Sequence, residues 1–266
     1  MTIRLERTAV GRITVREFIM GKFIISAVLA TAAFASPALA EDEVNWDGVY
    51  VGVNAGYTET KSDTAVTLGG AWASETTALQ TFVASNWSAK QSFGKENFGG
   101  QIGFNHQIGG AVIGLEANAS ALSGSNVRNT GPLPAPSPTY TFTNTVDPKA
   151  LYSIEAKAGV AMGKTLFYAH GGWAWVSANL STDVVSSGSY SKVGGVDSTL
   201  DGFIVGGGIE HKFSQHVSLR VDYSYTDQGD VNYVTTFRNG NFPTYTESVN
   251  QDLRLHLVRV GMNYHF

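Results

Sequence analysis

The sequence contains no cysteine, few charged residues and only one long hydrophobic run. The absence of cysteine excludes a disulfide framework and thiolate chemistry. Charged residues make up 15% of the 266 residues, below the roughly 25% of a typical soluble domain. The formal net charge is only −4, so no basic surface for nucleic acid is indicated. Glycine (30 residues) and aromatic residues (11%) are plentiful, and this composition favours alternating β-strands over packed helices.

The single hydrophobic run predicts an export signal. Residues 23–35 are apolar, follow the basic Lys22 and lead into Ala38-Leu39-Ala40. A basic region, a short apolar region and a small-residue end are typical of a secretory signal peptide. We therefore expect cleavage between Ala40 and Glu41.

This signal also sets the predicted domain organisation. We expect residues 1–40 to be removed and residues 41–266 to form the mature domain. A transmembrane helix is the alternative, but it needs about 20 apolar residues, and Pro37 ends the run early. Residues 1–19 are either an extended basic region or sequence upstream of a true start at Met20.

Beyond Glu41 the dominant pattern has a period of two residues. In DGVYVGVNAGYT (47–58), for example, valines alternate with glycine, tyrosine and asparagine. Such alternation is typical of strands with one apolar and one polar face. It recurs in seven further segments, so that eight strands are predicted in an all-β domain; the seven are 97–107, 111–122, 150–161, 165–180, 201–213, 216–228 and 251–266.

The connections between these strands alternate in length. Three are short, near residues 109, 163 and 214, whereas four are long and polar: 59–95, 123–148, 181–199 and 229–250. This arrangement predicts an eight-stranded antiparallel up-and-down transmembrane β-barrel with short periplasmic turns and long extracellular loops. Because every backbone polar group must be paired within hydrocarbon, the last strand should pair with the first.

The polar face of the strands carries charges of both signs. If the apolar face meets lipid, the polar face points into the barrel, where acids and bases can pair. An eight-stranded barrel is only wide enough to be filled by side chains, so we expect a packed polar interior instead of a wide pore. A soluble barrel such as a lipocalin is the inverted alternative, but the mixed charges, the strand-end aromatics and the export signal favour the membrane. The expected interior residues are Gln101, Glu116, Glu155, Lys157, Glu210, Arg220, Asp222 and Arg259.

Seven stretches carry a resemblance to a known family. In order they read WDGVYVGVNAGY, GGQIGFNHQ, VIGLEAN, LFYAHGGWAW, GFIVGGGIEHKF, VSLRVDYSYTDQG and VRVGMNYHF. Over residues 46–266 the chain resembles the small porin-like outer-membrane β-barrel proteins of alphaproteobacteria, which are related to the OmpA-like transmembrane domain. The resemblance implies an abundant eight-stranded barrel without an established reaction; some members are linked with haem binding or adhesion.

The resemblance also bears on individual residues. It implies that the outer-membrane assembly machinery recognises the terminal Phe266. The fourth strand departs from the family pattern, because Glu155 and Lys157 stand where inward arginines are usual. We therefore expect the internal charge pairing to be rearranged around this strand.

These observations predict a structural or surface-interaction role without catalysis, cofactor or metal. The expected partners are outer-membrane lipids, lipopolysaccharide and the assembly machinery, with the four long loops as the place for an extracellular ligand. A small porin for solutes and a haem- or ligand-binding surface protein remain alternatives. A lipid-modifying enzyme is a third, since His216 and Ser218 are two apart and would share a strand face. That face is expected to be the interior, which favours a polar strand start instead.

Overall fold

The computed structural model describes residues 44–133, 138–188, 190–238 and 244–266. All of them belong to one compact unit, Glu43–Phe266. The expected signal peptide and its cleavage site between Ala40 and Glu41 lie outside the described residues. The elements in the described part of the chain are β1 (Gly48–Gly70), the 3-10 helix η2 (Ala71–Ser74), α2 (Thr77–Trp87), β2 (Ala89–Ile108), β3 (Ala111–Leu122), β4 (Asn126–Leu133), β5 (Tyr140–Met162), β6 (Thr165–Ser186), β7 (Ser191–Lys212), β8 (Val217–Val234), β9 (Thr236–Phe237) and β10 (Tyr245–His265).

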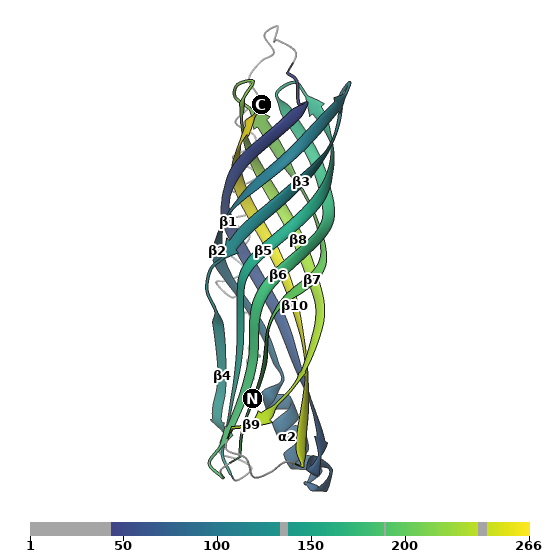
Figure 1. Cartoon of the computed structure of the whole chain (residues 1–266). Coiled ribbons are helices and arrows are strands. Elements are labelled where there is room, and N and C mark those ends of the chain that lie inside the picture. Colours follow the sequence, from purple (N-terminus) through teal and green to yellow (C-terminus); the bar gives the residue numbers. More distant parts are fainter. Residues whose placement is uncertain (1–43, 134–137, 189, 239–243) are drawn as a thin grey trace, which may run out of the picture. The chain divides into compact units, whose positions relative to one another are not determined.

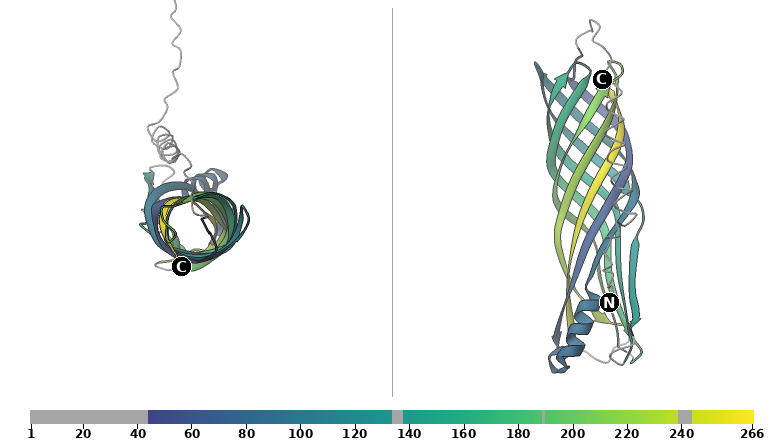
Figure 2. Two further views of the ribbon diagram at one scale, coloured as in Figure 1. Left: turned by 90° about the horizontal axis from the view of Figure 1, so that it is seen from above. Right: turned by 180° about the vertical axis from the view of Figure 1, so that it is seen from behind.

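Eight of these strands close into one antiparallel barrel (Figure 1). Around the ring the order is β1, β2, β3, β5, β6, β7, β8 and β10, and the end-on view in Figure 2 shows the closed ring. The last strand pairs with the first, as predicted, for example Tyr264 with Val51. Strands β4 and β9 are additions that pair with β5 and β7, respectively. The predicted eight-stranded antiparallel fold is therefore confirmed.

The two ends of the barrel differ in their connections. At one end three short turns join β2 to β3, β5 to β6 and β7 to β8. Gly109 and Gly163 sit in two of these turns with φ of 61° and 58°, which glycine adopts without strain. The chain also ends here, where the backbone N–H of Phe266 donates to the Val49 carbonyl (3.0 Å). We call this the periplasmic end, drawn at the top of Figure 1, and the opposite end the extracellular end.

The extracellular connections contain far more strand than predicted. The ranges 59–95, 123–148, 181–199 and 229–250 were predicted as loops, but β1 continues to Gly70 and β10 already begins at Tyr245. Beyond residue 58 the outward residues of β1 are no longer large and apolar, and threonine and serine are frequent on its inward face, so the backbone stays extended while the lipid-facing alternation ends. From Lys61 to Gly70 alone β1 adds roughly 30 Å of strand.

The connection from β1 to β2 also contains two short helices that the sequence pattern did not reveal. The Thr76 side chain caps α2 by accepting a hydrogen bond from the Leu79 N–H (3.3 Å). Val83 and Trp87 are the buried residues of α2. The apolar residues of this eleven-residue helix are not confined to one face, so they give little periodic signal. Within the described residues, no helix combines the length and the hydrophobicity that crossing a membrane requires.

In the extracellular half, β2 and β4 are joined by side-chain hydrogen bonds and not by a backbone ladder. β3 ends at Leu122, and β4 then takes its place beside β5. Among the described residues no ladder pairs β4 with the first residues of β2. Instead Arg128 Nη1 donates to the Lys90 carbonyl (2.7 Å), and Gln91 Nε2 donates to Asn126 Oδ1 (2.9 Å).

Candidate functional site

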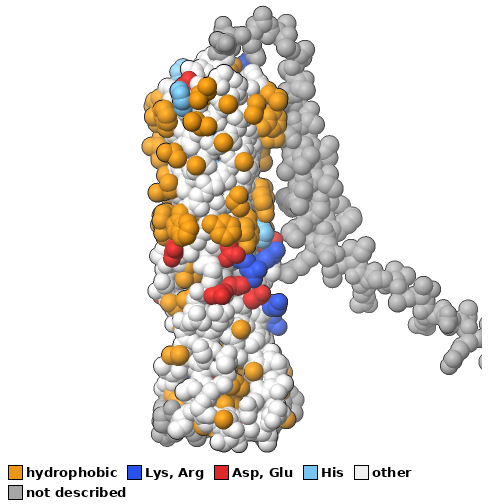
Figure 3. Space-filling view, turned by 90° about the vertical axis from the view of Figure 1, so that its right-hand side faces the viewer, with side chains coloured by type: hydrophobic (Ala, Val, Ile, Leu, Met, Phe, Trp, Pro, Cys, Tyr) orange, Lys and Arg blue, Asp and Glu red, His pale blue; other side chains and the backbone are white. Residues whose placement is uncertain are grey.

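The outer wall of the periplasmic half is apolar. Figure 3 shows this band in orange, followed toward the extracellular end by a group of charged side chains. Aliphatic residues such as Val53 and Ile102 are 67% and 54% exposed. Outward aromatic side chains accompany them, as is typical of the interfacial girdles of membrane barrels; they include Tyr57, Phe98, Trp173, Phe213, Tyr223, Tyr264 and Phe266.

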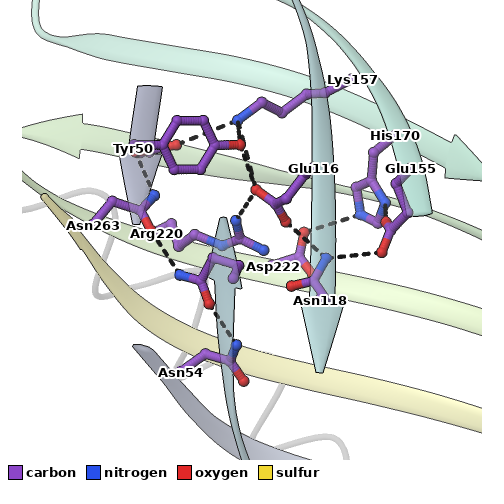
Figure 4. Close-up of polar contacts among 12 residues, drawn as sticks. Tyr50, Asn54, Glu116, Asn118, Glu155, Lys157, His170, Arg220, Asp222 and Asn263 are labelled. Carbon is purple, nitrogen blue, oxygen red and sulfur yellow. Dashed lines mark hydrogen bonds and ion pairs between the residues drawn. The ribbon is translucent and has the colours of Figure 1, made fainter. Parts of the chain in front are cut away.

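The interior of the same half holds a polar layer. The eight residues expected to point inward are all buried in the structure, as are Tyr50, Asn118, His170 and Asn263, which join them. Figure 4 shows how most of these side chains converge from several strands. The layer contains four carboxylates, three Lys or Arg cations and His170, so its charges nearly balance. It consists of Gln101, Glu116, Glu155, Lys157, Glu210, Arg220, Asp222 and Arg259 together with those four residues.

Glu116 lies at the centre of the polar layer. Its carboxylate accepts hydrogen bonds from Arg220 Nη1 (2.6 Å), the Tyr50 hydroxyl (2.6 Å) and Asn118 Nδ2 (3.0 Å). Lys157 Nζ lies 3.9 Å from the same carboxylate and donates to the Tyr50 oxygen (2.9 Å). Several donors on one carboxylate offset the large cost of removing the charge from water.

Asp222 organises a second group of contacts. It accepts a hydrogen bond from Arg259 Nη2 (2.7 Å), and His170 Nε2 lies 3.0 Å from its other oxygen. The opposite ring nitrogen of His170 contacts Glu155, which also accepts from Asn118 Nδ2 (3.0 Å). Glu155 is therefore paired with a histidine and linked through Asn118 to the first group.

Glu210 completes the layer toward the periplasmic end. It accepts from the Ser218 hydroxyl (2.5 Å) and from Asn263 Nδ2 (2.8 Å), and Lys157 Nζ lies 3.8 Å away. Gln101 Nε2 in turn donates to Asn263 Oδ1 (2.6 Å). Lys157, on the fourth barrel strand (β5), thus stands between Glu116 and Glu210.

Trp46 fills the interior at the periplasmic end. It precedes β1, is fully buried and packs with Val112, Leu166 and Tyr168. Its backbone N–H donates to Gln107 Oε1 (2.8 Å). A tryptophan just ahead of the first strand gave no periodic signal, and its role as a filler was not predicted.

The interior of the extracellular half contains a cluster of apolar side chains among uncharged polar ones. On β10 the inward residues change from Arg259 and Asn263 to Leu253, Leu255 and Leu257. The predicted packed polar interior did not include this apolar cluster. Further inward residues of this apolar cluster come from five other strands, and include Phe93, Leu122, Val146, Leu151, Val176, Leu180 and Ile204.

A buried carboxylate ties the extracellular connections together. Glu247 Oε1 accepts from Trp72 Nε1 (2.5 Å) and the Tyr190 hydroxyl (2.6 Å). Its Oε2 accepts from Lys192 Nζ (2.6 Å) and the Thr235 hydroxyl (2.5 Å). Burial, followed by the adjacent carboxylate, raises the pKa of Tyr190 well above its usual value. Glu247 therefore joins η2, β7, β10 and the β8–β9 connection.

The enzyme-like spacing of His216 and Ser218 does not form a relay. His216 is exposed and stacks on Tyr264 with ring centroids 5.7 Å apart, whereas Ser218 is fully buried. The expectation of a shared face was wrong, because β8 begins only at Val217 and His216 belongs to the preceding turn. In the described part of the chain, no group of three or more His, Asp or Glu side chains is placed to hold a metal ion.

A closed antiparallel barrel with an apolar outer band and an ion-paired interior defines a membrane-spanning β-barrel protein. Residues 26–266 match the family model described as outer membrane protein beta-barrel domain. The chain belongs to this family, so the protein is a β-barrel of the outer membrane of a Gram-negative bacterium. The resemblance noted in the sequence is thereby confirmed.

Several known proteins are similar to this chain. The 31 kDa outer-membrane immunogenic proteins of Brucella melitensis and Brucella suis are each 27% identical over 260 residues, covering 91% of this chain and 97% of theirs. Among solved structures, OprG of Pseudomonas aeruginosa has 13% identity and a TM-score of 0.44, with coverage of 85% and 100%. The protease OmpT of Escherichia coli has 9% identity and a TM-score of 0.44, with coverage of 87% and 99%.

Proposed function

We propose that this protein is a sealed, non-catalytic barrel with a structural or surface-interaction role. One observation carries the proposal: Arg220 on β8 and Glu116 on β3 form an ion pair between strands on opposite sides of the ring. A side-chain bridge across an eight-stranded barrel occupies the route that a solute would follow.

The layers on either side of this bridge support a sealed interior. Trp46 fills the periplasmic end, and the apolar cluster around Leu255 lies in the extracellular half. A charged or polar solute would have to break buried ion pairs and then cross an apolar region, and both steps are costly. These contacts argue against the alternative of a small porin.

The extracellular half supports a role at the cell surface. Long strands such as β7 and β10 extend beyond the apolar band, and Glu247 on β10 ties their extracellular ends together through Tyr190 and Lys192. Rigid strands of this kind hold a surface clear of the bilayer, where other molecules can contact it. A Brucella relative that is named immunogenic is in keeping with such an exposed surface.

The buried polar groups support the absence of catalysis. Ser218, His265 and Glu210 lie close together, but His265 contacts both other residues through the same Nε2 atom, at 3.0 Å and 3.1 Å. A serine nucleophile needs a histidine that uses one ring nitrogen for the serine and the other for the orienting carboxylate. All three are also buried, out of reach of a substrate.

Conductance in planar lipid bilayers tests the proposal. The purified, folded protein should produce no discrete current steps, whereas a known porin inserted under the same conditions provides the positive control. An Arg220→Ala variant indicates whether the bridge itself contributes to the seal, because removing it should raise the frequency of small openings. Stable steps of uniform size from the natural protein would overturn the sealed barrel in favour of a channel.

A further inference from the structure

A cluster of cations lies on the outer wall just beyond the apolar band. On β1 the outward aromatic Tyr57 is followed on the same face by Glu59, Lys61 and Asp63. Lys61 is therefore about 13 Å farther along the strand, or roughly 10 Å along the axis of a barrel with tilted strands. Since Tyr57 belongs to the aromatic girdle, this places Lys61 at the level of the outer headgroups.

Strand register brings three cations together at this level. Lys61 on β1 lies opposite Arg254 on β10, and Asp63 on β1 lies opposite Lys90 on β2. Asp63 Oδ2 lies 3.6 Å from Lys90 Nζ and 3.3 Å from Arg254 Nη2, so one carboxylate holds both. Together with Gln91 and Ser92, these residues line a hollow of about 210 Å³ that opens on the outer wall.

The cations remain available despite their carboxylate neighbours. The Lys90 side chain is 87% exposed and that of Lys61 is 44% exposed. A fourth cation, Arg128, donates to the Lys90 carbonyl and adds positive charge beside the hollow. Four carboxylates, Glu59, Asp63, Asp227 and Asp252, lie among these cations, but the two lysines keep their donors exposed on the outer wall.

Two other strands of the barrel carry only acidic residues at this level of the outer wall. On β7 and β8 the outward charged residues beyond the apolar band are Asp197, Asp201, Asp227 and Asp230, all of them acidic. A uniform belt of mixed charge would be expected if these residues served solubility alone. Lys61, Lys90 and Arg254 are instead gathered where β1, β2 and β10 meet, whereas the outward cations Lys149 and Arg238 lie elsewhere.

We propose that Lys61, Lys90 and Arg254 bind the phosphate groups of lipopolysaccharide in the outer leaflet. The partner follows from position and chemistry: the cluster faces the bilayer at headgroup level, and lysine and arginine form strong charge-assisted bonds with phosphate. Asp63 acts as the residue that positions Lys90 and Arg254. This goes beyond the sealed-barrel proposal and holds whether or not the barrel conducts.

Native mass spectrometry of the folded barrel in detergent tests this site. The probes are lipid A with two phosphates, its monophosphoryl form and its fully dephosphorylated form, with inorganic phosphate as a competitor. Affinity should decrease with each phosphate removed, and millimolar inorganic phosphate should not displace the bound lipid. The triple variant Lys61→Gln, Lys90→Gln, Arg254→Gln should bind the bisphosphate form at least about tenfold more weakly.

Single variants provide the matched control. Lys90→Gln should weaken binding about threefold, whereas Lys149→Gln, which removes an exposed lysine from β5, should change it less than twofold. Retention of the heat-modifiable gel shift confirms that each variant is folded. Unchanged affinity of the triple variant, or equal binding of dephosphorylated lipid, would overturn the proposal. Displacement by equimolar inorganic phosphate would show a free-phosphate site instead, and would also overturn it.

Discussion

Arg220 reaches across the interior of the barrel to Glu116, with its Nη1 atom 2.6 Å from the carboxylate oxygen. The two residues lie on β8 and β3, which are four strands apart in either direction around the ring. Their ion pair therefore links opposite walls directly, in addition to the hydrogen-bonded ladders that link neighbouring strands. Both side chains are buried, so neither charge is solvated if the other is removed.

Breaking this cross-barrel pair should be costly and non-additive. Arg220→Gln leaves Glu116 with Lys157 and Tyr50 but without its closest cation, so we expect a loss of about 3 kcal/mol in unfolding free energy. The double variant Glu116→Gln, Arg220→Gln should lose less than the sum of the single variants, by about 1–3 kcal/mol. Urea unfolding in detergent micelles measures this difference. Simple additivity would show that the two residues act independently.

Loss of Glu247 should loosen the extracellular connections without opening the barrel. Glu247→Ala leaves Lys192 buried and unpaired, at a cost of about 3–5 kcal/mol. We expect protease cleavage within η2 and α2 in the folded variant, while the periplasmic half stays intact on a gel. Glu59→Ala, which removes an outward carboxylate, is the control and should not change the cleavage pattern. Equal resistance of the Glu247 variant and the natural protein would contradict the assigned role.

The Tyr190 hydroxyl should make the extracellular half sensitive to alkaline pH. Its pKa is raised in the folded protein by burial and by the Glu247 carboxylate, so the folded state retains the proton more strongly than the unfolded state. Its contribution is fully present below about pH 10 and decreases as pH rises above that value, by at most about 1.4 kcal/mol per pH unit.

Comparison with Tyr190→Phe isolates this contribution. The variant lacks the ionisable hydroxyl, so its stability should decline less steeply than that of the natural protein between pH 10 and pH 11. Tyr140 and Tyr233 also have raised pKa values and are present in both proteins. Urea unfolding followed by tryptophan fluorescence at a series of pH values measures the two slopes, and identical slopes would refute the prediction.

Phe266 should matter for assembly more than for stability. Its side chain is 72% exposed, and its ring contacts Tyr264 at a centroid distance of 5.2 Å. We expect Phe266→Ala to reduce the amount of folded barrel in the outer membrane severalfold, yet to leave refolding in detergent nearly unchanged. Phe213→Ala, another exposed aromatic at the same end, should behave like the natural protein in both assays. Equal outer-membrane levels of all three proteins would argue against an assembly signal.

The sequence was informative wherever lipid contact imposes a pattern. Residues that face hydrocarbon must be apolar and those behind them need not be, so the strict alternation in segments such as 47–58 identifies a strand and its lipid face. On β10 the alternation inverts near Val258. From Val258 to the periplasmic end the outward residues are apolar, whereas on the extracellular side of Val258 the inward residues are apolar. The inversion occurs because the outer wall of the extracellular half faces water instead of lipid, while the interior of that half contains an apolar core.

What the sequence determined by itself is therefore the all-β fold, the number of strands, the short turns and the identity of the lipid face. These features follow from local alternation and from the requirement that the sheet has no open edge in the membrane. Tertiary structure alone decided that Arg220 meets Glu116, that Trp46 fills the periplasmic end, and that Lys61, Lys90 and Arg254 gather on one wall. Those relationships depend on barrel closure and strand register, which bring together residues that are far apart along the chain.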